Sequence, residues 1–111
     1  MMSINVTAHR HVTIVEVSGR VDGMNAGELG EAISGEIDKG SVRLVLDLSQ
    51  VDYMSSAGLR ELVNSFKKAR KLLGDIRLAQ PSDRVREVLE MSGLDTVFRI
   101  FNTQSEAVAS Y

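Results

Sequence analysis

The run "VRLVLDLS" at residues 42–49 is the feature of this sequence that most constrains its fold. It is almost continuously apolar over eight residues. A strand of that composition is typical of parallel or mixed sheets, in which helices cover both faces. We therefore expect this strand to lie at the centre of a sheet.

Two helical patterns flank this strand. Before it, Asn25 with Glu28 three residues later predicts a capped helix start, and Gly40 predicts the stop. The apolar stripe between them consists of Leu29, Ile33 and Ile37. After the strand, a longer helix is expected to end at Gly74, where a left-handed backbone is easily adopted. Its apolar residues recur at helical spacings: Leu59, Leu62, Val63, Phe66, Ala69 and Leu73.

The rest of the chain supplies shorter elements. Residues 4–10 and 12–19 predict a hairpin that turns at Arg10 and His11 and ends at Gly19. The later elements are a strand "DIRLAQ", a helix from Ser82 or Asp83 to Gly93, a strand "VFRIF" and a short helix capped by Thr103 and Glu106. The order ββαβαβαβα predicts one α/β domain over residues 1–111, a mixed sheet with about four helices.

The size and composition limit the class of protein. A chain of 111 residues fits one domain. The absence of cysteine excludes disulfides and thiolate chemistry and favours a reducing compartment. No apolar run reaches the roughly 20 residues of a membrane span, and the first residues lack a signal-peptide core. We expect a soluble, cytoplasmic protein without a membrane partner.

The charge pattern gives no support to nucleic-acid binding. The 13 basic and 15 acidic side chains leave a net charge of −2, so the chain has no bulk attraction for polyanions. The basic run "FKKARK" at residues 66–71 alternates with apolar residues at helical spacing and is interpreted as a solvated helix face. Tryptophan is absent, which removes one stacking platform for bases.

The sequence offers little to an enzyme. A nucleophilic serine needs a base, and the only histidines are His9 and His11 in the first hairpin. The paired serines at 55 and 56 do not lie in a G-x-S-x-G elbow. The two histidines lack a third metal ligand at a recognisable spacing, and no phosphate-binding glycine loop is present. We expect no catalysis, metal or cofactor.

Two adjacent serines, Ser55 and Ser56, lie between the central strand and the long helix. A hydroxyl there can cap the helix, and a phosphate attached there would meet free backbone N–H groups at the positive end of the helix dipole. Position alone therefore leaves open whether these serines are caps or phosphate acceptors.

Three collinear motifs resemble the STAS domain family, specifically its single-domain anti-sigma factor antagonists. The run "VLDLSQVDYMSSAGLREL" is similar to the family's strand followed by an Asp-Ser-x-Gly-Leu helix start. The segment "SGRVDGMNAGEL" is similar to the family's Gly-x-(Leu/Ile/Val)-Asp segment, and "LEMSGLDTVFRIF" to its Ser-Gly-Leu-x-x-x-Phe segment. The resemblance spans nearly the whole chain.

The resemblance implies that Ser56 is the residue phosphorylated by a partner serine kinase, with Ser55 as a less favoured acceptor. Ser55 stands where the family usually has Asp, and Arg60 stands where a small residue is frequent. In the family, the loop before the first helix carries an acidic residue that contributes to kinase binding, and Asp22 matches this residue. The implied partner surface comprises Asp22, Met54, Ser55, Ser56, Ala57, Gly58 and Arg60.

The same resemblance implies a function in partner switching. The unphosphorylated protein is expected to bind an anti-sigma factor that is also a serine kinase of the ATP-binding, histidine-kinase-like type. Phosphorylation of Ser56 is expected to release it, and a serine phosphatase to reverse the modification. The alternative is a constitutive STAS subunit that scaffolds a transporter or signalling assembly, in which Ser56 is only a helix cap.

Overall fold

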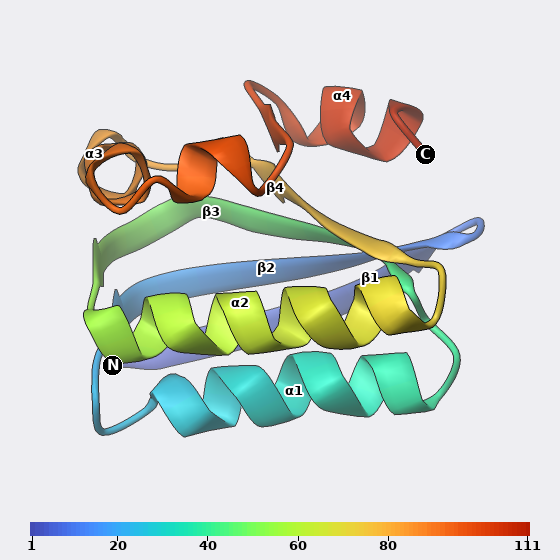
Figure 1. The fold of residues 1–111 in the computed structure, drawn as a ribbon, viewed down its shortest axis with the longest axis horizontal. Coiled ribbons are helices and arrows are strands. Elements are labelled where there is room, and N and C mark those ends of the chain that lie inside the picture. Colours follow the sequence, from blue (N-terminus) through green and yellow to red (C-terminus); the bar gives the residue numbers. More distant parts are fainter.

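The computed structural model describes residues 1–111, with helices on both sides of one sheet (Figure 1). The strands are β1 (Met2–His9), β2 (Val12–Val21), β3 (Arg43–Met54), β4 (Asp75–Ala79) and β5 (Ile100–Phe101). The helices are α1 (Ala26–Asp38), α2 (Ser56–Lys71), α3 (Asp83–Met91) and α4 (Gln104–Ala109). This order confirms the predicted ββαβαβαβα arrangement. No helix combines the length with the apolar composition that a membrane span requires.

The sheet is mixed and has the strand order β1-β2-β3-β4-β5, with β3 at its centre as predicted. β1 is antiparallel to β2, and the other neighbouring strands are parallel. The predicted end of β2 at Gly19 is wrong, because the strand runs on to Val21 and pairs there with Met54. Gly19 adopts a φ of 91° at a register irregularity between the two strands. Its glycine conformation therefore bends the strand instead of ending it.

The core is divided between the two faces of the sheet. In Figure 1, α1 and α2 run side by side below the strands, and α3 and α4 lie above them. Alternate residues of β3, Leu44, Leu46 and Leu48, join a cluster of 19 buried residues that includes the stripes of α1 and α2. Val45 points the other way, into a smaller cluster with Ala107 of α4. The apolar run is thus covered on both faces, as its composition predicts.

The end of α2 differs from the expectation. The helix stops at Lys71, and Leu73, which was predicted to lie on its buried stripe, is 97% exposed with a φ of 63°. Gly74 does not adopt the left-handed conformation predicted for it. A side chain at Gly74 would overlap the backbone carbonyl of Val42. This glycine is therefore required for close packing, and the left-handed residue is the one before it.

The last predicted strand, "VFRIF", is only partly a strand. Residues Leu94–Thr96 form a short 3-10 helix, Val97 is 43% exposed, and β5 covers only Ile100 and Phe101. Phe98 is instead buried, with its ring edge-on to that of Phe66 at 5.0 Å between centroids. The aromatic and β-branched composition predicted a strand, but packing of this one ring against α2 decides the local path.

Candidate functional site

The candidate site is the corner where β3 ends and α2 begins. Ser55 has extended backbone angles and is the N-cap of α2. Its Oγ accepts a hydrogen bond from the Gly58 N–H at 3.3 Å, and its carbonyl accepts from the Leu59 N–H at 3.0 Å. Ser55 therefore performs the capping role that the sequence left open between the two serines.

Ser56 is the first residue of α2, and its side chain is exposed. Its hydroxyl makes no hydrogen bond within the protein, and neither do the backbone N–H groups of Ser56 and Ala57. These N–H groups are free because no turn of the same helix precedes them to supply carbonyl acceptors. The corner thus presents an unengaged hydroxyl beside two unengaged donors.

Gly58 and Met54 form the floor of this corner. Met54 is 2% exposed and Gly58 is buried, so neither offers a surface to a partner. Both residues belong to the partner surface expected from the sequence, and in the structure they lie beneath the exposed part of the corner. A Cβ on Gly58 would lie 2.5 Å from Met54 Sδ and 2.8 Å from Val21 Cγ1. The glycine lets the first turn of α2 pack directly on the ends of β2 and β3.

The loop that carries Asp22 lies next to the serine corner. The Ser55 N–H donates to the Val21 carbonyl at 2.9 Å, which joins the end of β2 to the start of α2. The carboxylate of Asp22 accepts from the Met24 N–H at 2.9 Å and pairs with Arg20 Nε at 3.3 Å. The Asp22 side chain is 30% exposed. Its first role is therefore to shape this loop.

Asn25 does not cap α1 with its side chain as predicted. Its Oδ1 accepts from the Asp22 N–H at 2.9 Å, and its Nδ2 donates to the Arg20 carbonyl at 2.8 Å. The Ala26 N–H instead donates to the Asp22 carbonyl at 2.8 Å. The Asn25 amide closes the loop, because one N–H donor and one carbonyl acceptor of the loop lie within reach of its side chain.

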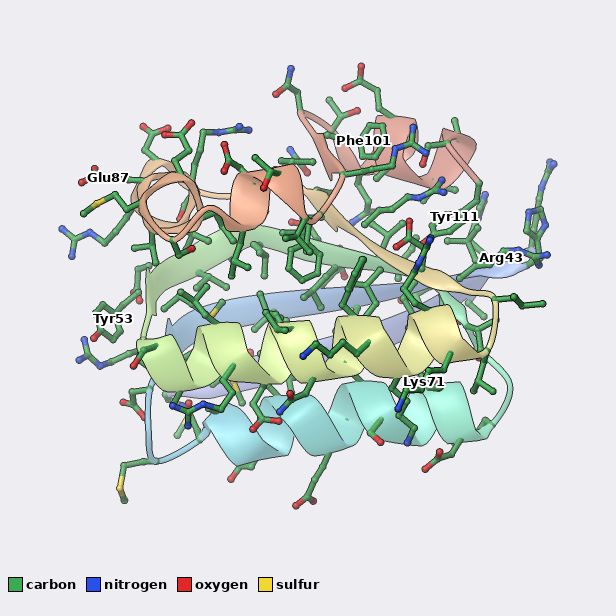
Figure 2. All side chains as sticks on the ribbon, in the orientation of Figure 1. Arg43, Tyr53, Lys71, Glu87, Phe101 and Tyr111 are labelled. Atoms are coloured by element: carbon green, nitrogen blue, oxygen red, sulfur yellow. The ribbon has the colours of Figure 1, made fainter.

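Sequence reasoning missed the pairing of Arg20 with Tyr53. The guanidinium of Arg20 lies 4.0 Å from the centroid of the Tyr53 ring, a cation–π distance. Figure 2 shows Tyr53 at the end of the sheet where α2 begins. No signal in the sequence joins these residues, because their proximity depends on the shifted register between β2 and β3.

The remaining residues of the expected partner surface divide by exposure. Ser56 and Arg60 are exposed, whereas Asp22, Ser55 and Ala57 are half-buried. The exposed part of the corner is therefore small, and its centre is the first turn of α2. The histidines His9 and His11 are exposed around the turn between β1 and β2, outside this corner.

The fold and this corner are those of a small α/β module with a serine pair at the start of its longest helix. A family model described as the STAS domain matches residues 3–107. The chain belongs to the STAS domain family, and within it to the anti-sigma factor antagonists.

Several similar proteins are described as anti-sigma factor antagonists. A candidate anti-sigma factor antagonist of Bordetella bronchiseptica, BtrV, is 38% identical over 95 residues, which cover 86% of this chain and 82% of BtrV. The anti-sigma-F factor antagonist RsfB of Mycobacterium tuberculosis is 30% identical over 107 residues, covering 96% and 87%. An anti-sigma factor antagonist from Mycobacterium paratuberculosis superposes with a TM-score of 0.91 and 29% identity over 99% of this chain and 93% of that one. These relatives are regulatory binding proteins and not enzymes.

Proposed function

We propose that this protein acts by partner switching in the cytoplasm. In its unphosphorylated form it binds an anti-sigma factor that is also a serine kinase of the ATP-binding, histidine-kinase-like type. Phosphorylation of Ser56 releases it, and a serine phosphatase restores the binding form. Neither a nucleic acid nor a membrane takes part. The observation that carries this proposal is the exposed Ser56 hydroxyl without a structural partner, beside a neighbouring serine that already caps the helix.

The choice of Ser56 over Ser55 rests on access. Ser55 is half-buried and its Oγ is engaged by the Gly58 N–H. A kinase has to bring the attacking hydroxyl in line with a γ-phosphate, and Ser56 can reach such a position without loss of a hydrogen bond in its own protein. Ser55 would have to give up the cap first.

Phosphorylation of Ser56 is expected to leave the fold intact. The phosphate brings about −1.5 to −2 charges at neutral pH. On the free protein these charges meet the unengaged N–H groups of the first turn of α2 and the positive end of its dipole. Such interactions stabilise by about 0.3 to 1 kcal/mol at an exposed site.

Phosphorylation of Ser56 is expected to weaken binding to the partner. Within a complex the same dianion has to be desolvated against the partner, which is costly when no cation of the partner compensates it. Each 1.4 kcal/mol of such a penalty weakens binding about tenfold. A penalty of a few kcal/mol therefore separates a bound state from a released one.

The test of the proposed function is a phosphorylation reaction with the cognate kinase and ATP, followed by tandem mass spectrometry. We expect one phosphate, on Ser56. Phosphate on Ser55 alone, or on neither serine, would contradict the assignment. A protein recovered in a stable assembly irrespective of the state of Ser56 would favour the constitutive scaffold instead.

Variants of Ser56 test the electrostatic mechanism of release. Calorimetric titration against the kinase should show that Ser56→Asp loses most of the affinity while Ser56→Ala keeps it. Denaturation curves of both variants serve as the control, because the exposed hydroxyl makes no contact whose loss would unfold the protein. Equal affinities of the two variants would refute the mechanism.

We also propose that Asp22 belongs to the docking surface, as the half-buried acidic residue of the loop beside the corner. Its carboxylate supports the loop through Met24 and Arg20, so charge reversal would disturb the loop as well as the surface. Asp22→Asn keeps one oxygen acceptor for the Met24 N–H and removes the charge together with the acceptor for Arg20 Nε. We expect about a fivefold loss of kinase affinity, near 1 kcal/mol, with little change in the melting temperature. Unchanged affinity would exclude the charge from the docking surface.

A further inference from the structure

Arg60 is an exposed cation without a partner at the candidate site, one helical turn after Ser56. It lies in α2, and its guanidinium forms no ion pair, hydrogen bond or cation–π contact in the protein. The other arginine of the corner is already engaged, because Arg20 pairs with the carboxylate of Asp22 and lies over the ring of Tyr53. An unengaged guanidinium is free to bind an anion that arrives nearby.

The spacing in α2 brings Arg60 to the modified residue. Ser56 and Arg60 are four positions apart in one continuous helix, so their side chains lie on the same face, one turn from each other. The order also suits an ion pair, since an acidic group four residues before a basic one is the more stabilising arrangement. The corresponding position for Ser55 is Leu59, which carries no charge.

The surrounding charges leave this cation uncompensated. Glu61, the neighbouring acid on α2, has its carboxylate against Gly30 of α1. Arg20 and Asp22, after β2, pair with each other. Two further charged residues of opposite sign, Asp52 of β3 and Arg84 of α3, line a depression together with Arg20 and Tyr53, and Arg60 is not among its lining residues.

We propose that Arg60 binds the phosphate of Ser56 within the same molecule, as an intrahelical phosphate clamp. This inference rests on the proposed function, in which Ser56 is modified. The clamp uses a guanidinium, whose planar fork matches phosphate oxygens and can donate two hydrogen bonds to them.

The clamp has a consequence for the switch. Phosphorylation adds a dianion to the corner and at the same time withdraws the free guanidinium of Arg60 from the surface. The surface presented to a partner therefore changes at two positions, Ser56 and Arg60, through one covalent event. Release then does not depend on charge repulsion alone.

The test installs phosphoserine at position 56 by genetic encoding, so that no kinase is needed, and follows its titration by phosphorus NMR. The second phosphate pKa, ordinarily near 6, should be lower in the protein with Arg60 than in Arg60→Gln by about 0.2 to 0.4 unit, from the strength of helical ion pairs. Arg60→Lys should retain part of the effect. Lys67→Gln, an exposed cation on the same helix without an ion pair, is the matched control and should leave the titration unchanged.

The outcomes separate the clamp from the proposed function. An Arg60→Gln protein that titrates like its parent overturns the clamp, whatever the kinase does. A shift that appears in Lys67→Gln to the same extent also overturns it, because it would reflect the net charge of the helix. A lowered pKa that requires Arg60, together with a kinase that ignores Ser56, would leave the clamp standing and refute the proposed function. High salt should shrink a genuine difference.

Discussion

Replacement of Gly58 by alanine tests whether the glycine of the serine corner is there for packing. Two effects oppose each other. Alanine favours a helix interior over glycine by about 1 kcal/mol. The added methyl would lie 2.5 Å from Met54 Sδ and 2.8 Å from Val21 Cγ1. The methionine can move its flexible end, but Val21 is stiff and fully buried.

Overpacking of this kind costs about 1 to 3 kcal/mol. The balance is a net destabilisation of about 1 kcal/mol, within a range from about 0 to 2. Unfolding entropy near 2.1 cal/mol/K per residue over 111 residues amounts to about 230 cal/mol/K. We therefore expect the melting temperature of Gly58→Ala to fall by about 4 °C.

Gly35→Ala is the matched control, because Gly35 lies inside α1 and a methyl there meets no atom within 4 Å. Only the propensity effect operates, so this variant should melt about 2 to 4 °C higher, from 0.5 to 1 kcal/mol. Calorimetry or circular dichroism gives the melting temperatures of both variants for comparison with wild type. If Gly58→Ala were stabilised as much as Gly35→Ala, the close packing at the corner would be refuted.

Two further predictions concern the cap of α2 and the last residue. Ser55→Ala should lower the free energy of unfolding by about 1 kcal/mol through loss of the cap, whereas Ser56→Ala should change it by less than about 0.5 kcal/mol. Urea denaturation of the two variants measures both changes. Equal losses of stability would contradict the assignment of Ser55 as the cap. The Tyr111 hydroxyl lies 2.7 Å from the carbonyl oxygens of both Leu44 and Asp75, and burial, aided by the charge of Asp75, raises its pKa well above the ordinary value. Because the pKa is raised in the folded state, the stability it contributes is present below about pH 10 and lost as the pH rises further. Tyr111→Phe should lower the free energy of unfolding by about 1 kcal/mol at pH 7. Urea denaturation at a series of pH values should show that this difference from wild type narrows above about pH 10. A difference that stays constant with pH would refute this linkage.

Much of the fold was predictable because its elements are strongly patterned. The apolar run around Leu46 requires cover on two faces, and the 3.6-residue period in α2 requires one buried face. Both signals are carried by residues that lie within a few positions of one another in the chain. The ends of elements were less predictable. At Leu73 and Gly74, the close approach of Val42, distant in sequence, decides which residue adopts the left-handed conformation.

The sequence by itself determined that this chain is one mixed α/β domain, that two serines lie where its central strand meets its longest helix, and that these motifs resemble the STAS family. Only the tertiary structure decided that Ser55 caps the helix and Ser56 is free. It also showed that the carboxylate of Asp22 supports its own loop. The physical reason is that periodicity and propensity are properties of a segment. The engagement of a hydroxyl or a carboxylate depends on local backbone angles and on the register between strands, and these are set only when the segments pack together.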